Sequence, residues 1–244
     1  MMTSENRVPI NQPVVMYQNW EELLFLHWSF EPELIQQVLP PGLLVDTFNE
    51  RAWVGVVPFF MSGVRPRFLP SIPGVSNFQE LNLRTYVVDE QGRRGVWFYS
   101  LDTSDRLPVW IARRFFHLNY VYARMTAVRS DQQIAYKSTR STSGGAVVEQ
   151  GFVWQRKGAA TLAEVGSLEY FLVERYRLYS FDVKRQQLFT GLVAHEPYQI
   201  QCVELGEYST RLFALNGFDE PACAPESVIA SRGAKVRIYP LSRV

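Results

Sequence analysis

Residues 77–88 read NFQELNLRTYVV, and the alternation of side chains along this stretch predicts a β-strand with two different faces. Because successive side chains of a strand point in opposite directions, the large aliphatic groups of its middle part share one face. Those groups are Leu81, Leu83 and Val87. The opposite face carries two aromatic rings and three polar groups, namely Phe78, Glu80, Asn82, Arg84 and Tyr86. Such a polar face suits the lining of a cavity as well as it suits solvent, so the stretch points to a pocket but not to a reaction.

Strand signals continue on both sides of this stretch and predict a mainly β fold with a few short helices. The expected strands are 23–30, 43–48, 52–61, 95–102, 120–128, 134–139, 146–155, 176–183, 187–194 and 198–204. Short helices are expected with Pro32 in the first turn, over 107–117 and over 168–175, the last capped by Ser167. Strands and helices do not alternate as they do in a parallel sheet. We therefore predict a closed antiparallel β-barrel, because closure removes exposed sheet edges.

The length of 244 residues and the lack of a linker predict one barrel domain over residues 14–244. Residues 1–13 are polar with two prolines and are expected to form a mobile arm. Hydrophobic residues make up 47% of the chain, which is enough to build a large core.

Composition also excludes several classes of function. The 25 basic and 24 acidic residues leave a net charge of +1, so the electrostatic footprint of a nucleic-acid binder is missing. No apolar run is long enough to cross a bilayer, and we expect neither a membrane partner nor an export signal. Cys202 and Cys223 have no paired spacing, which fits a cytoplasmic protein without disulfides.

Three groups of residues are candidates for a site. The first is Glu80, Asn82 and Arg84, whose end members lie roughly 13 Å apart along a strand and must find partners on neighbouring strands. In the second, Arg113 and His117 are expected on the same side of a helix, and adjacent Arg113 and Arg114 point about 100° apart. An inward arginine there would bind a carboxylate or phosphate with its two-pronged guanidinium.

The third group, Glu174 and Arg175, closes the helix over 168–175, and a structural role is favoured for both. The only histidines are His27, His117 and His195, and none has a second ligand at metal-binding spacing. Phosphate-loop, dinucleotide and nucleophile-elbow motifs are missing as well. The sequence therefore predicts neither a metal nor a cofactor.

Taken together, several segments between Trp20 and about His195 resemble the YqjF-like family of uncharacterised bacterial proteins. The segments are 24–28 (LFLHW), 39–43 (LPPGL), 53–59 (WVGVVPF), 80–87 (ELNLRTYV), 112–118 (ARRFFHL) and 167–169 (SLE). This resemblance implies the cone-like β-barrel fold of the acetoacetate decarboxylase-like superfamily, which agrees with the barrel expected from the strands.

The resemblance also implies a mechanism that can be checked against these residues. Acetoacetate decarboxylase forms a Schiff base on a lysine, near a glutamate in an aromatic-x-Glu strand. Phe78-Gln79-Glu80 looks like that strand, so Glu80 matches the glutamate. Counting forward from Ala112 places Tyr120 at the position of the lysine. A tyrosine cannot form an imine, and the nearest lysine along the chain, Lys137, falls on another predicted strand.

Three hypotheses about function follow. The first is a cytoplasmic barrel that binds a small anionic organic molecule, with a carboxylate as the expected group, in an interior cavity lined by Glu80, Asn82, Arg84, Tyr86, Arg113, His117 and Tyr120. The second is a lyase or hydratase without a Schiff base, with Glu80 as general acid or base and Tyr120 as proton donor. The third treats the polar groups as a structural network, with function through surface contacts or a homo-oligomer.

Overall fold

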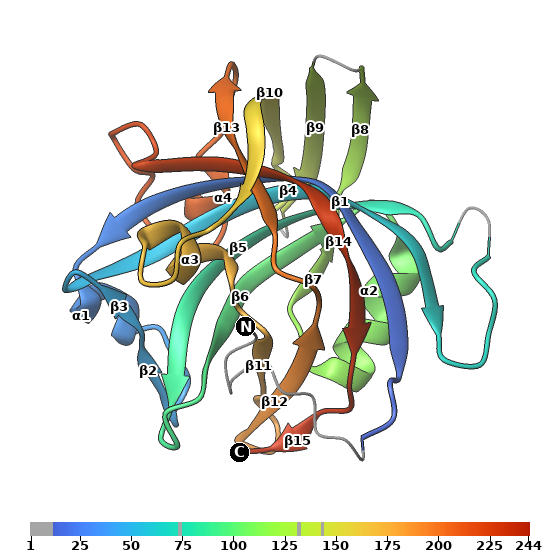
Figure 1. Cartoon of the computed structure of the whole chain (residues 1–244). Helices are drawn as coiled ribbons and strands as arrows, with labels where there is room; N and C mark the ends of the chain where they lie inside the picture. Colours follow the sequence, from blue (N-terminus) through green and yellow to red (C-terminus); the bar gives the residue numbers. More distant parts are fainter. Residues whose placement is uncertain (1–11, 73–74, 131–132, 143) are drawn as a thin grey trace.

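The computed structural model describes residues 12–72, 75–130, 133–142 and 144–244, so most of the predicted arm, residues 1–13, lies outside it. The fifteen strands of these ranges form one hydrogen-bonded sheet (Figure 1). They are β1 (Met16–Phe30), β2 (Leu43–Val45), β3 (Thr47–Phe48), β4 (Arg51–Pro66), β5 (Phe78–Asp89), β6 (Arg94–Thr103), β7 (Tyr120–Tyr122), β8 (Arg124–Arg129), β9 (Ile134–Ser141), β10 (Val147–Leu162), β11 (Arg177–Asp182), β12 (Gln187–Ala194), β13 (Gln199–Leu205), β14 (Ser227–Ile238) and β15 (Ser242–Arg243). The helices are α1 (Pro32–Gln36), α2 (Arg106–Ile111), the π-helix η2 (Ala112–Phe116), α3 (Leu168–Val173) and α4 (Arg211–Ala214).

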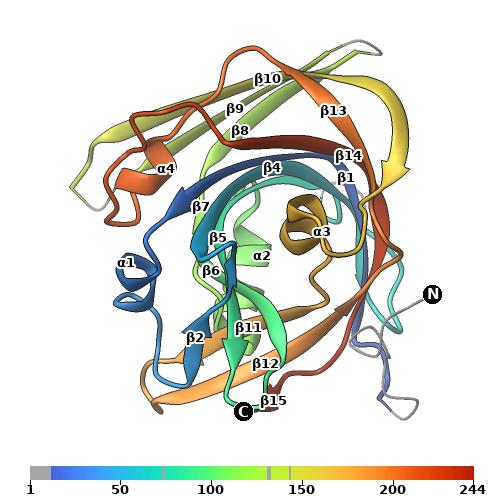
Figure 2. The same cartoon turned by 60° about the vertical axis from the view of Figure 1, so that its left-hand side comes forward.

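Seven strands close into a ring in the order β12, β11, β6, β5, β4, β1 and β14, and β14 pairs again with β12. Six of these seven pairings are antiparallel and the step from β11 to β6 is parallel. The view along the ring in Figure 2 shows the curve of these strands. The predicted mainly β fold with short helices is confirmed, but the sequence did not indicate the two parallel pairings of the sheet, β6 with β11 and β6 with β7.

Both faces of the central strands are buried, because the part of the sheet formed by β8, β9, β10 and β13, called the outer sheet below, covers the outside of the ring. The outward side chains of β1, β4 and β5 form a core with β8, β9, β10 and α4. Members of this core include Leu26, Val54, Leu81, Leu83 and Trp154. In Figure 2 the strands β8, β9, β10 and β13 lie across the outer side of β4 and β1. This double burial explains the continuous apolar run Leu23-Leu24-Phe25-Leu26, which would alternate on a strand with one wet face.

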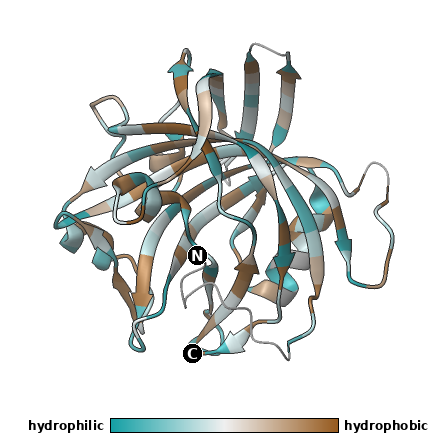
Figure 3. Ribbon diagram, in the orientation of Figure 1, coloured by the Kyte–Doolittle hydropathy of each residue, from teal (hydrophilic) through white to brown (hydrophobic). Residues whose placement is uncertain are grey.

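A second core fills the inside of the ring. Its members come from the opposite faces of the same strands, among them Phe25, Phe59 and Tyr86, and from α3. Figure 2 shows α3 inside the curve of β1 and β4. Ser167 caps this helix by accepting a hydrogen bond from the amide of Tyr170, as the sequence predicts. Hydrophilic and hydrophobic stretches alternate along the strands in Figure 3, as expected when neighbouring residues face different surroundings.

The fold differs from the sequence prediction in several elements, and the strand expected over 120–128 is divided into β7 and β8. The helix expected over 107–117 begins as α2 but continues as the π-helix η2, which ends before His117 at a backbone φ of 52°. The C-terminal strand β14 was not predicted, because Ser231, Arg232 and Gly233 interrupt its apolar pattern. Within the described ranges, no helix has the length and apolar character needed to cross a membrane.

Gly233 in β14 is required by a close backbone approach, and this generates the first prediction. Its φ is +130°, and an added Cβ would lie 1.8 Å from the carbonyl oxygen of Trp20 on β1. We expect Gly233→Ala to lower the free energy of unfolding by about 3 kcal/mol or more, through strain and overpacking. Denaturant unfolding measures the effect.

Gly217 provides the matched control. Its φ is +84°, but a Cβ there would meet nothing within 4 Å. Gly217→Ala should therefore cost only about 1–2 kcal/mol, the price of the left-handed backbone alone. Equal losses in the two variants would contradict the close contact between β14 and β1.

Candidate functional site

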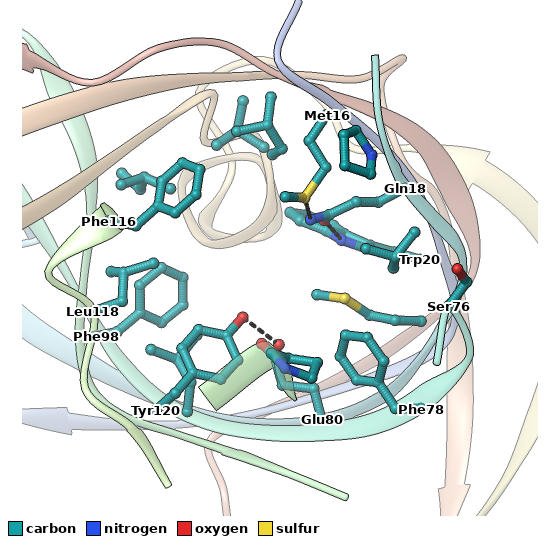
Figure 4. A pocket seen from close by; sticks show the side chains of 18 of the residues that line it. Met16, Gln18, Trp20, Ser76, Phe78, Glu80, Phe98, Phe116, Leu118 and Tyr120 are labelled. Atoms are coloured by element: carbon teal, nitrogen blue, oxygen red, sulfur yellow. Dashed lines mark hydrogen bonds between the residues drawn. The ribbon is translucent and has the colours of Figure 1, made fainter. Parts of the chain in front are cut away.

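The inside of the ring contains a cavity of about 370 Å³ between α2, η2, the loop after β4 and the inward faces of β5, β6, β12 and β14. Most of its lining side chains are apolar. Its polar members are Gln18, Ser76, Glu80, Arg84, Tyr120, Arg175, Arg177 and Tyr198. In Figure 4, Phe98, Phe116 and Leu118 face Met16 and Trp20 across the open space. A largely apolar pocket with a few placed polar groups is the usual form of a small-molecule site.

Glu80 and Tyr120 form a hydrogen-bonded pair on the wall of the cavity. The Tyr120 hydroxyl donates to Oε2 of Glu80 at 2.7 Å, the dashed line between these two side chains in Figure 4. Two strand pairings bring them together, because Glu80 lies beside Thr103 on β6 and Tyr120 lies parallel to Leu101 on the same strand. The structure thus joins the two residues predicted to act together.

Burial in this apolar setting changes the protonation of Glu80. Loss of solvent raises the pKa of Glu80 from 4.5 to about 7, although the hydrogen bonds from Tyr120 and Asn82 oppose the rise. Asp102 lies on the other side of the β-layer with a pKa raised by burial to about 7, and its charge raises that of Glu80 further. Burial and the neighbouring carboxyl also raise the pKa of Tyr120 well above its ordinary value. Glu80 can therefore both hold and release a proton near neutral pH.

Arg84 carries a buried charge on the wall of the cavity. Its guanidinium donates to the carbonyl oxygen of Leu172 at 3.0 Å and to the Tyr86 hydroxyl at 3.3 Å, and it lies 5.3 Å from the centre of the Phe25 ring. Its Nε atom is buried and has no hydrogen-bond partner among the described residues. In the same part of the chain, no carboxylate lies within ion-pair distance of Arg84.

Two further arginines line the cavity and were not singled out as ligand-binding residues. Arg175 pairs with Asp46 at 2.7 Å, so its charge is largely compensated, and the favoured structural role agrees with this. Glu174 accepts hydrogen bonds from the Tyr176 hydroxyl and from the Tyr198 amide. Arg177 donates to the hydroxyl of Thr190 at 3.3 Å. Arg177 and Tyr198 reach the cavity only because the ring closes, and no local sequence signal marks them.

Asn82 and Tyr86 lie behind the cavity and are not among its lining residues. The amide of Asn82 donates to Oε1 of Glu80 at 3.4 Å, and its own oxygen has no described protein partner. The Tyr86 hydroxyl donates to the carbonyl of Leu172 at 2.8 Å and lies 2.7 Å from Nε2 of His27. Both residues support the groups that face the cavity, Glu80 in one case and Arg84 in the other.

Arg113 and His117 are not brought into the cavity. Together with Arg114 they line a separate groove on the outside of the ring, and Phe98 and Leu118 border both the cavity and the groove. The Nε–H group of Arg113 donates to the backbone carbonyl of Tyr120 at 2.6 Å. Arg113 and His117 lie outside the cavity because the chain forms the π-helical turn η2 here. This turn breaks the 3.6-residue spacing on which the prediction of an inward arginine rested.

The cationic side chains among the described residues that line the cavity are all arginines. No lysine occurs among the described residues that line it, and Lys137 is exposed on β9 in the outer sheet. The described ranges also contain no group of three or more histidine, cysteine, aspartate or glutamate side chains placed to hold a metal ion.

Comparisons with known proteins identify relatives for the whole ring. Residues 17–235 match the family DUF2071, described as an uncharacterized conserved protein. The chain is 40% identical over 190 residues to the uncharacterized protein YqjF of Bacillus subtilis (strain 168), covering 78% of this chain and 76% of that protein. The resemblance inferred from the sequence segments is thereby confirmed.

Solved structures with the same fold are much more distant in sequence. Acetoacetate decarboxylase from Legionella pneumophila superposes with a TM-score of 0.62 at 13% identity, covering 98% of this chain and 90% of that one. The enduracididine biosynthesis enzyme MppR, complexed with pyruvate, superposes with a TM-score of 0.63 at 12% identity, covering 96% and 91%. These likenesses confirm the acetoacetate decarboxylase-like fold, and at such identities they show the fold alone.

The raised pKa of Glu80 predicts a specific dependence of stability on pH. Between pH 4.5 and about 7 the unfolded chain releases the Glu80 proton while the folded protein keeps it, so stability falls as the pH rises through this window. Glu80→Gln removes this contribution. The wild type should lose about 3 kcal/mol more than Glu80→Gln between pH 4.5 and 7.5, measured by denaturant unfolding at each pH.

Glu149→Gln is the control, because Glu149 is exposed on β10. Its stability curve should run parallel to that of the wild type over the same pH range. If the curve of Glu80→Gln were also parallel, Glu80 would titrate as it does in the unfolded chain, and the account of its burial would be wrong.

Proposed function

The chain belongs to the DUF2071 family of uncharacterized conserved proteins, and we propose that it binds a small organic anion in the interior cavity of its barrel. The observation that carries this proposal is the buried guanidinium of Arg84, which lines the cavity with one N–H group lacking a described partner. A buried charge without a counter-charge is costly, so the site favours an anion that supplies one. A carboxylate matches the two-pronged donor geometry of a guanidinium.

The remaining charges of the cavity support an anionic ligand. Asp46 compensates Arg175, but Arg84 and Arg177 have no such partner in the described ranges. Glu80 is the only acidic side chain among the described lining residues, and its raised pKa makes it half neutral near pH 7. The complex of MppR with pyruvate supports the proposal further, because in it a protein of the same fold binds a small carboxylate.

The proposal does not include imine chemistry. A Schiff base needs a neutral amine next to the bound carbonyl compound, and the described lining residues offer arginines and tyrosines in place of lysine. Arginine does not lose its proton in proteins, and the side chain of tyrosine has no nitrogen. Tyr120, which the resemblance aligns with the lysine, holds the carboxyl of Glu80 instead.

The hydrogen bond between Glu80 and Tyr120 favours a second candidate function, a lyase or hydratase without a Schiff base. A carboxyl group with a pKa of about 7 can abstract a proton from a bound acid and return it. In this case Glu80 is the general acid or base, Tyr120 donates a proton to the developing oxyanion, and Arg84 holds the carboxylate of the substrate. Binding alone requires only the last of these roles.

We include a cytoplasmic location in the proposal. Cys202 and Cys223 are exposed and unpaired, and exposed free thiols persist in a reducing compartment.

The central prediction concerns Arg84. In calorimetric titrations with pyruvate, acetoacetate and longer monocarboxylates, at least one acid should bind in a 1:1 ratio, and Arg84→Gln should weaken it by tenfold or more. Such a loss corresponds to about 1.4 kcal/mol or more, the range of a charged hydrogen bond. Arg124→Gln, which removes an exposed guanidinium on the outer sheet, should leave the affinity unchanged.

If Arg84→Gln proves unstable, Arg84→Lys keeps the charge but loses the two-pronged geometry and should still weaken the acid. Equal binding by the wild type and both Arg84 variants would rule out this guanidinium as the anion site.

A separate prediction tests the exclusion of imine chemistry. Sodium borohydride reduces an imine to a stable amine, so incubation with acetoacetate and borohydride would mark a reactive lysine. Intact-mass spectrometry should show no added mass on this protein, and any conversion of the acid by the wild type should be lost in Glu80→Gln. An adduct on Lys137 or any other lysine would overturn the exclusion.

A further inference from the structure

The cavity is larger and more apolar than a short keto acid requires. An apolar cavity of about 150 Å³ is sufficient to bind a benzene ring, and this one has a volume of about 370 Å³. Acetoacetate has only a single methyl group to place against apolar walls. The cavity offers such walls on both sides, from Phe98, Phe116 and Leu118 on one and from Met16 and Trp20 on the other (Figure 4). Met61 also lines it.

The polar groups that lack protein partners gather at one end of this space. Arg84 lies there, and its Nε atom has no hydrogen-bond partner among the described residues. Burial raises the pKa of the Tyr198 hydroxyl, and the positive charge of Arg84 opposes this rise. Within the described residues that hydroxyl makes no hydrogen bond, and Tyr198 also lines the cavity. An anion bound here would accept hydrogen bonds from both side chains.

The hydrogen-bonded pair of Glu80 and Tyr120 leaves the middle of the cavity free for an apolar group. Both oxygens of Glu80 already accept hydrogen bonds, one from Tyr120 and one from Asn82. A hydrocarbon chain lying beside Glu80 therefore leaves neither oxygen of that carboxyl without a hydrogen bond. Glu80 precedes Arg84 by four residues on β5, so a ligand extending roughly 13 Å from Arg84 passes it.

The apolar lining continues to the surface. Leu69 and Ile72 of the loop after β4 are each 55% exposed, and Leu107 of α2 is 44% exposed, yet all three line the cavity. Phe78 opens β5 at this end, six residues or roughly 20 Å along the strand from Arg84. The mouth of the cavity, defined by Leu69, Ile72 and Leu107, is thus apolar, and the cationic end lies deep inside.

We propose that the ligand is a carboxylic acid with an extended apolar body, its carboxylate held by Arg84 and Tyr198 and its body running past Phe98 and Met61 to the mouth. This inference rests on the proposed function and narrows its ligand class. It predicts that affinity depends on two separate features of the ligand, the charge at one end and the length of the hydrocarbon.

Straight-chain monocarboxylates from acetate to dodecanoate, each below its micelle concentration, test the length dependence. In calorimetric titrations of the whole protein, each added methylene should tighten binding about fourfold, the effect of burying one CH₂ group. The gain should stop once the chain reaches the mouth. Octanol, with the same chain and no charge, should bind at least tenfold more weakly than octanoate.

Two variants test the placement of the ligand at its two ends. Arg84→Gln should weaken octanoate by tenfold or more and change octanol by less than twofold. Val64→Phe narrows the cavity near its mouth, where Val64 is only partly buried, and should weaken decanoate while leaving butyrate unchanged. Binding of octanoate that neither variant alters would place the acid elsewhere and overturn the inference.

The outcomes separate this inference from the proposed function. If acetate, pyruvate and octanoate bind with equal affinity, the apolar body contributes nothing; the inference is then wrong, and the anion-binding function stands. If none of the acids binds at millimolar concentration, both the inference and the proposed function fail.

Discussion

The site depends on the burial of both faces of β5, a strand in the wall of the closed ring. Leu81 and Leu83 pack between the ring and the outer sheet, while Glu80 and Arg84 face the cavity. A shift of one residue along β5 would exchange the two sets, moving two ionisable groups into the apolar layer and the leucines into the cavity. The register is therefore fixed by the cost of burying those groups, and the polar pattern of the cavity follows from it.

The same burial affects the carboxyl of Glu80 and the guanidinium of Arg84 differently, although both line one cavity. The carboxyl of Glu80 is neutralised in part by its raised pKa and is satisfied by Tyr120 and Asn82. The guanidinium of Arg84 lacks a carboxylate partner in the described ranges, and its Nε atom has no hydrogen-bond partner there. Because a bound anion relieves only the second group, the cavity favours binding at Arg84, whereas any proton transfer would depend on Glu80.

The sequence predicted the parts of this arrangement that depend on local periodicity. Alternation along residues 77–88 was enough to place Glu80 and Arg84 on one face, and the similarity of segments was enough to bring Tyr120 to Glu80. Arg113 and His117 were assigned to the same cavity from helical spacing, which fails where the helix becomes a π-helix. The place of Arg177 and Tyr198 in the cavity could not be predicted, since it depends on closure of the ring by residues far apart in the chain. The strand β14 was missed because its apolar pattern is interrupted.

The central claim is that a carboxylate binds at Arg84 deep inside an apolar cavity. A crystal structure with 8-bromooctanoate tests it most directly, because anomalous scattering locates the bromine independently of the rest of the density. The account predicts carboxylate oxygens within hydrogen-bonding distance of Arg84 and Tyr198, and bromine near Leu69 and Ile72 at the mouth. A carboxylate at the mouth with bromine beside Arg84, or the acid bound in the outer groove beside Arg113, would contradict it.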